Sequence, residues 1–199
     1  MKITMKYYTK KTIEFYNKNV DAYTKSGAVV LKNKIDKFIK LLCGKKILDV
    51  ACGPGHDTDY FAKKGFDCLG IDLSEKMIAS AKKNFQGKFR IMDFFDMEFK
   101  ENSFDGIWCS AAIVHTDKND LDKLLEDFGK ILGQNGVLGI IAHAKQKRTK
   151  KKGDSRIFTV FDKDELGKHL KNNGFEVVHS KSFSYKKKRW LFIISKKIG

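Results

Sequence analysis

The sequence predicts an α/β protein: a single doubly wound, seven-stranded, mostly parallel sheet with helices on both faces and an antiparallel last strand. The first observation is that short apolar runs alternate along the chain with segments of helical periodicity. The second is that residues 137–142, VLGIIA, are apolar throughout, as in a central strand covered on both faces. The third is that the runs 175–178 and 190–195 are joined by only about ten residues, too few for a parallel crossover.

Each element follows from its local pattern. Strands are expected where the apolar runs lie, at residues 47–50, 68–71, 88–92, 104–109, 137–142, 175–178 and 190–195. Helices are expected where apolar residues recur every three or four positions, at 12–23, 29–42, from 56 onward, 75–84, 119–132 and 162–172. Ser74 is the natural N-cap of the helix over 75–84, and Gly174 suits the C-terminal cap of the last helix.

Length and composition indicate one domain, residues 1–199, which is long enough to bury about 70% of its unfolded surface. No apolar run approaches the length of a membrane span, and residues 1–11 are too charged for a secretory signal. The four cysteines are scattered without a C-x-x-C pair, which favours reduced thiols over a disulfide framework or a metal site. We therefore expect a cytoplasmic protein without a membrane partner or a metal.

The most informative segment is the strand-turn-helix-strand unit over residues 47–77. Asp49 ends the first apolar run, and after three intervening residues the turn carries Gly53 and Gly55. Glycines allow the backbone to approach a ligand closely, and the N–H groups that open the next helix face that ligand. Asp72 ends the second strand, where an acid holds a ribose diol in nucleoside-binding sheets. The segment therefore predicts a nucleoside-containing cofactor.

A dinucleotide fingerprint does not fit this segment. It requires a third glycine in the frame G-x-G-x-x-G, and that position is Thr58 when counted from Gly53, or His56 when counted from Ala51. The frame that fits is an acid, three residues and then G-x-G. This frame, with Gly70-Ile71-Asp72-Leu73-Ser74 and the following Met77, resembles the first two motifs of the class I S-adenosylmethionine-dependent methyltransferases.

The resemblance extends over roughly residues 13–196, through the segments 91–94, 104–110 and 132–138. It implies a single methyltransferase domain in which residues 1–44 form N-terminal helices that act as a lid, and residues 45–199 form a Rossmann-like core. It also implies that S-adenosylmethionine is the cofactor. The residues that it places around this cofactor are Tyr16, Tyr23, Asp49, Ala51, Cys52, Gly53, Gly55, Asp72, Leu73, Met77, Asp93, Phe94 and Cys109.

The resemblance implies different roles for these cofactor-binding residues. The turn 51–55 should hold the methionine part of the cofactor and Asp72 the ribose, while Leu73, Met77, Asp93 and Phe94 should surround the adenine. Simpler interpretations stay open for several of these residues. Met77 and the two tyrosines of the N-terminal helices could be ordinary core, and Asp93 could cap a helix.

The implied chemistry is in-line transfer of a methyl group, for which the protein supplies mainly proximity and orientation. A base is needed only for a poorly nucleophilic acceptor, and the candidates are His115 and His143, which follow the fourth and fifth strands. Alternatively, His115 caps the next helix or faces water. Ser110 and His115 are expected to border the acceptor pocket. The N- and C5-methylating motifs of nucleic-acid base methyltransferases are missing, because Cys109-Ser110-Ala111-Ala112 occupies their place.

The net charge of +16 is unevenly distributed. Residues 145–199 carry seventeen Lys or Arg against five acids, and the surplus gathers in the runs Lys145–Lys152 and Lys186–Arg189. Both runs should lie at the ligand edge of the sheet, where they would attract an anionic acceptor or remain solvated loops. Arg156 could bind an acceptor carboxylate or phosphate.

We therefore expect a methyltransferase whose acceptor is a small, possibly anionic molecule. An RNA methyltransferase that uses the basic runs is the first alternative. A non-catalytic protein that keeps the cofactor fold to bind a partner is the second, and the oligomeric state is left open.

Overall fold

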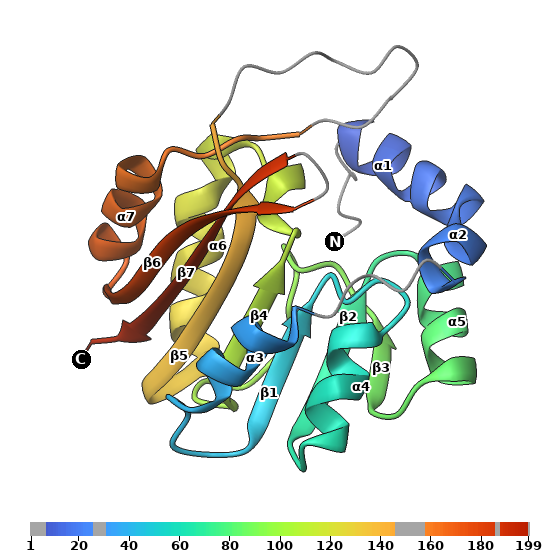
Figure 1. Cartoon of the computed structure of the whole chain (residues 1–199), viewed down its shortest axis with the longest axis horizontal. Helices are drawn as coiled ribbons and strands as arrows, with labels where there is room; N and C mark the ends of the chain where they lie inside the picture. Colours follow the sequence, from blue (N-terminus) through green and yellow to red (C-terminus); the bar gives the residue numbers. More distant parts are fainter. Residues whose placement is uncertain (1–6, 26–30, 146–157, 186–187, 199) are drawn as a thin grey trace.

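The computed structural model describes residues 7–25, 31–145, 158–185 and 188–198. In these residues seven strands form one sheet in the order β3-β2-β1-β4-β5-β7-β6 (Figure 1). The strands are β1 Lys46–Val50, β2 Asp67–Asp72, β3 Lys88–Ile91, β4 Phe104–Ser110, β5 Leu132–His143, β6 Phe175–Tyr185 and β7 Lys188–Lys197. The strand β7 runs antiparallel to β5 and β6, and the remaining pairs are parallel. The predicted doubly wound sheet and its antiparallel last strand are confirmed.

Helices cover both faces of this sheet. They are α1 Tyr7–Lys18, α2 Val20–Lys25, α3 Lys32–Ile39, α4 His56–Lys63, α5 Glu75–Asn84, η1 Ile113–His115, α6 Lys118–Ile131 and α7 Lys163–Asn172. On one face, Phe38 of α3 and Phe61 of α4 pack on Trp108 of β4 in a buried cluster. On the other face, the apolar stripe of α6 and Leu166 of α7 join the larger core cluster. The helix α5 packs on β3 through Ile78 and Ala81.

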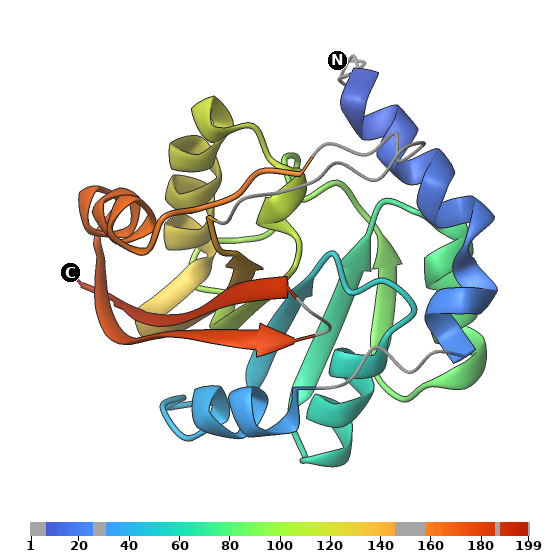
Figure 2. The same ribbon diagram turned by 45° about the horizontal axis from the view of Figure 1, so that its top comes forward.

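The helices α1 and α2 lie outside these layers, along α5 and past the carboxyl ends of β2 and β3 (Figure 2). The sequence predicts one helix over 12–23, but the structure has two, with Asn19 between them. The Asn19 side-chain amide donates to the Phe15 carbonyl over 2.7 Å, and its own carbonyl accepts from the Tyr23 N–H over 3.1 Å. A side chain that competes for backbone hydrogen bonds in this way interrupts a helix.

The strands that exceed their predicted bounds by most are β5 and β6. The strand β5 begins at Leu132 rather than 137, and its register against β4 shifts between Phe104 and Gly106. Asn135 has φ 59° there, as expected of a residue that tolerates the left-handed region. The strand β6 continues to Tyr185 because it pairs with β7 along its whole length. The two closing strands therefore form a long hairpin whose turn lies at the carboxyl edge of β5.

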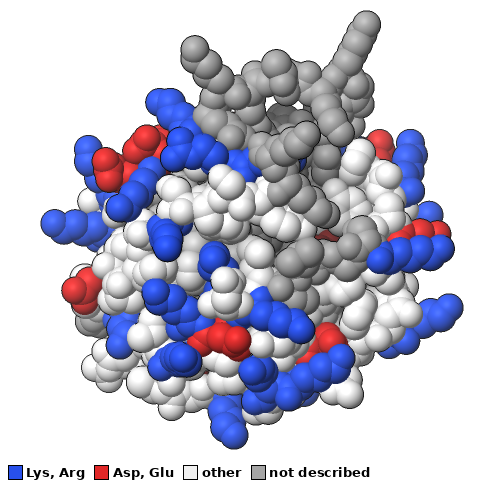
Figure 3. Space-filling view, in the orientation of Figure 1, with Lys and Arg blue, Asp and Glu red and all other residues white. Residues whose placement is uncertain are grey.

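The face of the molecule drawn in Figure 3 carries more Lys and Arg than acidic side chains over α3 and the neighbouring part of the sheet. Among the residues described, no helix combines the length and the apolar character needed to cross a bilayer. Within the segment 1–44, α1 and α2 stand over the carboxyl edge, whereas α3 places Ile35 and Phe38 in the core.

Candidate active site

Three residues of the turn after β1 have a left-handed backbone conformation. Ala51, Gly53 and Gly55 have φ values of 54°, 55° and 96°, which turn the chain sharply from β1 into α4. The Cys52 N–H donates to the Ile71 carbonyl over 2.9 Å and ties the turn to the end of β2. Gly55 is the N-cap of α4 and offers no side chain to the first N–H groups of that helix. The turn therefore presents backbone donors at the carboxyl edge of the sheet.

The two glycines of the turn have different surroundings. A Cβ atom at Gly53 would have no heavy atom within 4 Å, so this position opens into empty space. A Cβ atom at Gly55 would lie 2.8 Å from the Phe89 ring and 2.9 Å from Cβ of Ala81. Gly55 is thus required for the packing of the turn against β3 and α5, while Gly53 leaves room for a ligand.

Asp72, at the end of β2, fixes the turn through both carboxylate oxygens. Oδ2 accepts from the Gly53 N–H over 2.9 Å, and Oδ1 accepts from the Ser74 N–H over 2.8 Å. Burial raises the pKa of Asp72, and these backbone hydrogen bonds act in the opposite direction. A carboxylate has about four acceptor positions, so Asp72 keeps capacity to accept from a ribose hydroxyl. Ser74 also caps α5 by accepting from the Met77 N–H over 3.1 Å, as the sequence predicts.

Two more carboxylates stand beside the turn. Asp49 is 2% exposed and accepts from the Thr58 hydroxyl over 2.6 Å. Asp57, in the first turn of α4, accepts from the indole N–H of Trp108 over 2.8 Å. Burial raises the pKa of Asp49 well above its usual value, with further contributions from Asp57 and Asp72, and burial also raises the pKa of Asp57. Within the described residues no Lys or Arg forms an ion pair with these three carboxylates.

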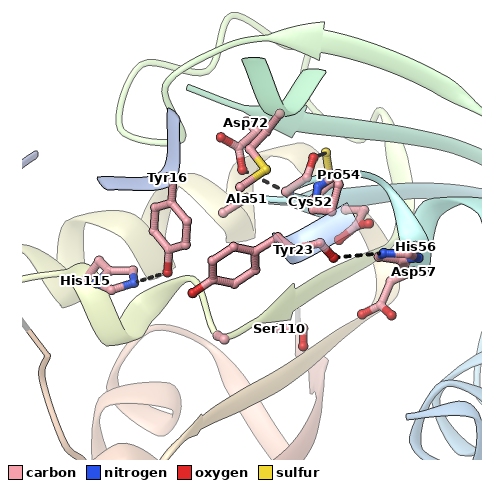
Figure 4. A pocket seen from close by; sticks show the side chains of 14 residues that line it. Tyr16, Tyr23, Ala51, Cys52, Pro54, His56, Asp57, Asp72, Ser110 and His115 are labelled. Atoms are coloured by element: carbon pink, nitrogen blue, oxygen red, sulfur yellow. Dashed lines mark hydrogen bonds between the residues drawn. The ribbon is translucent and has the colours of Figure 1, made fainter. Parts of the chain in front are cut away.

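These groups border a cavity of about 200 Å³ at the carboxyl edge, between the two halves of the sheet (Figure 4). Its lining residues are Tyr16, Tyr23, Asp49, Ala51, Cys52, Gly53, Pro54, His56, Asp57, Asp72, Met77, Ser110, Ala111 and His115. Most of the residues predicted for the cofactor and the acceptor thus meet in one place. Asp57 and His56 are additions that the sequence analysis missed, although both follow the glycine turn directly.

The N-terminal helices close one side of the cavity. The Tyr16 hydroxyl lies 2.9 Å from Nε2 of His115, and the Tyr23 ring packs edge-on against Tyr16 at 5.3 Å (Figure 4). Three further contacts fasten these helices to the core. The Ser74 hydroxyl donates to the Asn17 side chain over 2.6 Å, the Thr24 and Ser80 hydroxyls lie 2.8 Å apart, and His56 Nε2 lies 3.3 Å from the Tyr23 carbonyl.

Other predicted residues lie outside the lining of this cavity. The Asp93 carboxylate accepts from the Phe95 N–H over 2.9 Å, and the Phe94 ring packs on Phe95, while Leu73 is half-buried beside Asp72. The Cys109 side chain is fully buried in the core, and burial raises the pKa of its thiol to about 12. A cofactor contact from Cys109 would therefore have to come from its backbone.

His143 also differs from expectation. It is 3% exposed and is sandwiched between rings, at 5.5 Å from Phe158 and 4.1 Å from Trp190, away from the lining of the cavity. Phe158 links it to His115, whose ring lies 5.0 Å away. This arrangement favours a packing role for His143, one ring away from His115.

The basic runs are only partly described. Arg156 and residues 146–152 lie outside the described residues, as do residues 186 and 187. Lys145 follows β5, and the Arg189 carbonyl accepts from the Ala144 N–H over 3.1 Å. Lys188 places its ammonium 5.9 Å from the centre of the Phe158 ring. The described ends of both runs therefore lie at the carboxyl edge, as the topology predicts.

Comparison with known proteins assigns this arrangement to a family. A family model described as a methyltransferase domain matches residues 47–136. The chain is 28% identical over 173 residues to phosphoethanolamine N-methyltransferase 3 of Arabidopsis thaliana, covering 79% of this chain and 34% of that protein. The chain therefore carries a methyltransferase domain over residues 47–136. It spans only about a third of the length of this plant methyltransferase.

The match covers a larger share of two other relatives. The chain is 28% identical over 173 residues to phosphoethanolamine N-methyltransferase of Plasmodium falciparum, covering 81% of this chain and 65% of that one. It is 30% identical over 150 residues to the putative methyltransferase YqeM of Bacillus subtilis, covering 69% and 59%. Among solved structures, the 1,6-didemethyltoxoflavin-N1-methyltransferase of Burkholderia thailandensis, with bound S-adenosylhomocysteine, has the same fold. Its TM-score is 0.78 at 19% identity, and the match covers 96% of this chain and 87% of that chain.

The cavity fits the cofactor of the family, S-adenosylmethionine. The space in front of Gly53 admits a ligand against the backbone, and Asp72 offers acceptors for hydroxyl groups. Buried carboxylates without cationic partners are costly, so Asp49 and Asp57 favour a ligand that carries positive charge. S-adenosylmethionine carries a sulfonium and an ammonium group.

Proposed function

We propose that this protein transfers the methyl group of S-adenosylmethionine to a nucleophilic atom of a small molecule, with Tyr16 and His115 at the acceptor end of the site. The observation that carries the proposal is the Tyr16–His115 hydrogen bond in the wall of the cavity that also contains the glycine turn and Asp72. Cofactor-holding and proton-handling groups therefore share one cavity.

The residues around the glycine turn bind S-adenosylmethionine and orient it. Asp72 receives the ribose hydroxyls, Met77 contributes an apolar wall, and the backbone at Gly53 allows close approach. When bound, S-adenosylmethionine supplies a methyl group activated by the positive charge on its sulfur. Asp49 and Asp57 provide negative potential on the same side of the cavity, which favours binding of a cation.

Tyr16 and His115 handle the proton of the acceptor. With Nε2 of His115 unprotonated, the Tyr16 hydroxyl donates its hydrogen bond to that nitrogen. The Tyr16 oxygen can then accept a proton from the acceptor while its own proton moves to Nε2. A pair of this kind serves as a general base near neutral pH, because the proton ends on an imidazole. Ser110 and Ala111 line the adjoining part of the cavity and limit the size of the acceptor.

We propose a small amine that also carries an anionic group as the acceptor. Support comes from the relatives named phosphoethanolamine N-methyltransferases and from the position of Lys145 and Arg189 at the same edge of the sheet. A basic rim raises the local concentration of an anionic acceptor.

The test is a methyl-transfer assay with labelled S-adenosylmethionine and three acceptor classes: phosphoethanolamine, ethanolamine and total RNA. Label in methylated phosphoethanolamine, lost in His115→Ala, is the expected result. Label in ethanolamine alone would remove the anionic requirement, and label in RNA would replace the acceptor class. Binding of S-adenosylhomocysteine without transfer to any acceptor would favour a non-catalytic role.

A further inference from the structure

Four nitrogen-bearing side chains meet where α3 crosses β6, on the face of the sheet opposite to α6 and α7. Lys34 and Lys37 are one helical turn apart on α3 and share one side of that helix. His179 and Lys181 alternate along β6 and therefore point to the same face of the sheet. Their partners in β7 are Ile194 and Phe192, both buried beneath α3. None of the four side chains borders the cofactor cavity.

Aromatic rings position these groups. The Lys34 ammonium lies 4.6 Å from the centre of the Phe183 ring and 5.7 Å from that of Phe192. The His179 ring packs against Phe192 with centroids 5.2 Å apart. A lysine held over aromatic faces keeps its charge in one place instead of sampling solvent. The Lys34 ammonium is therefore held in a defined position over the Phe183 and Phe192 rings.

The charge of the cluster is not balanced by nearby acids. Burial, Lys181 and Lys37 lower the pKa of Lys34, and burial together with the three lysines lowers the pKa of His179. Asp36, the acid of α3, is engaged elsewhere, because it accepts from the Tyr60 hydroxyl over 3.0 Å and lies 3.4 Å from the Lys64 ammonium. Among the described side chains, no acid forms an ion pair with Lys34, Lys37 or Lys181.

The cluster differs in this respect from the lysines of α6. On α6, Lys123 and Lys130 pair with acids one turn away, at 2.7 Å and 2.5 Å. Like charges that converge without an acid repel each other and destabilise the folded chain. A dianionic ligand would remove this repulsion and would satisfy several ammonium donors at once.

We propose that the α3–β6 cluster, formed by Lys34, Lys37, His179 and Lys181, is a phosphate-binding site separate from the cofactor cavity. The ligand class is a phosphate ester, which is either a small phosphorylated molecule or the backbone of single-stranded RNA. The cluster lies on the face where Lys and Arg gather in Figure 3.

The first experiment follows the imidazole resonances of His179 by NMR while pyrophosphate is added to the full-length protein. Bound phosphate favours the protonated imidazole, so the midpoint of the His179 titration should move to higher pH. Lys34→Gln with Lys181→Gln should weaken pyrophosphate binding at least tenfold. The matched control removes two charges from the last turn of α5, as Lys82→Gln with Lys83→Gln, and should change the affinity less than twofold.

Thermal melting gives a second readout that does not depend on the cofactor. Without ligand at low salt, the Lys34→Gln, Lys181→Gln protein should melt no lower than the wild type, because repulsion is relieved. Pyrophosphate should raise the melting temperature of the wild type and of the α5 control, but not that of the cluster variant.

A single-stranded RNA ten-mer separates the two sources of phosphate. If RNA is the ligand, it should displace pyrophosphate, and its affinity should fall with salt at a log–log slope of about −0.7 per phosphate contact. If a small molecule is the ligand, RNA should leave the His179 resonances in place. An unmoved His179 with both probes, or equal losses in the cluster variant and the α5 control, would overturn the proposal.

Discussion

The hydroxyl of Tyr16 lies 2.9 Å from Nε2 of His115, and this contact joins α1 to η1 across 99 positions of the sequence. Neither residue could be assigned this partner from its local pattern. The contact places a phenol and an imidazole in the wall of the cavity, and both come from segments outside the strand-helix-strand unit that carries the glycine turn.

The first prediction concerns this pair. His115→Ala and Tyr16→Phe should each lower kcat by about 100-fold while leaving S-adenosylmethionine affinity nearly unchanged, since both act on the proton of the acceptor. If the two residues work as one unit, the double variant should lose little more than either single variant. Steady-state kinetics and calorimetry measure the two quantities. Losses that multiply in the double variant would show that the residues act independently.

The second prediction concerns Asp72. Asp72→Ala should weaken cofactor binding by about 1.5–3 kcal/mol, because it removes charged acceptors for the ribose hydroxyls. The matched control is Asp67→Ala at the other end of β2, whose side chain forms an exposed ion pair with Lys88. Calorimetry should show wild-type affinity for this control. Equal weakening in both variants would exclude a direct ribose contact.

The third prediction separates the two glycines of the turn. Gly53→Ala should fold with a loss of about 1–2 kcal/mol for its left-handed backbone, but bind S-adenosylhomocysteine poorly because its methyl group enters the cavity. Gly55→Ala should lose more stability, since its methyl group would meet Phe89 and Ala81 at 2.8 Å and 2.9 Å. Chemical denaturation and ligand titration check the two outcomes. The opposite ranking of the unfolding free energies would contradict the packing role of Gly55.

The fourth prediction is a pH dependence. Burial raises the pKa of Asp57, so the folded chain holds this proton more tightly than the unfolded chain does. This contribution to stability is complete below the ordinary carboxyl pKa and is lost as pH rises through the raised pKa. In the ligand-free protein, Asp57→Asn should therefore melt at a temperature that increasingly exceeds the wild-type value as pH rises from about 4 to 8. Differential scanning calorimetry measures this difference, and a constant difference would show that Asp57 ionises normally.

Much of the fold could be predicted because it is encoded locally. The apolar runs locate the strands, the Ser74 cap fixes the start of α5, and the short connection between the last runs reveals the direction of β7. The glycine turn with Asp49 and Asp72 likewise locates the cofactor cavity, since these residues lie within one strand-helix-strand unit.

The rest depends on contacts between distant segments. The second half of β6 is mostly polar around Phe183 and contains no apolar run that would predict a strand. Its length is set by its pairing with β7. The hydrogen bond of Asp57, in α4, depends on Trp108, which is buried in β4. The α3–β6 cluster arises only when a helix near the N-terminus crosses an edge strand near the C-terminus. Periodicity and motif spacing contain no information about such meetings.

The strand order that ends β5-β7-β6 also determines where the sequence of this protein can vary during evolution. Because β7 runs against its neighbours, its first residues, Lys188 and Arg189, pair with β6 beyond the point where His143 ends the pairing with β5. Hairpin tips tolerate insertions because no core packing depends on their length. Evolution can therefore change the length or the charge of this end of the hairpin, while the pairing of Trp190 with His143 keeps the strands in register.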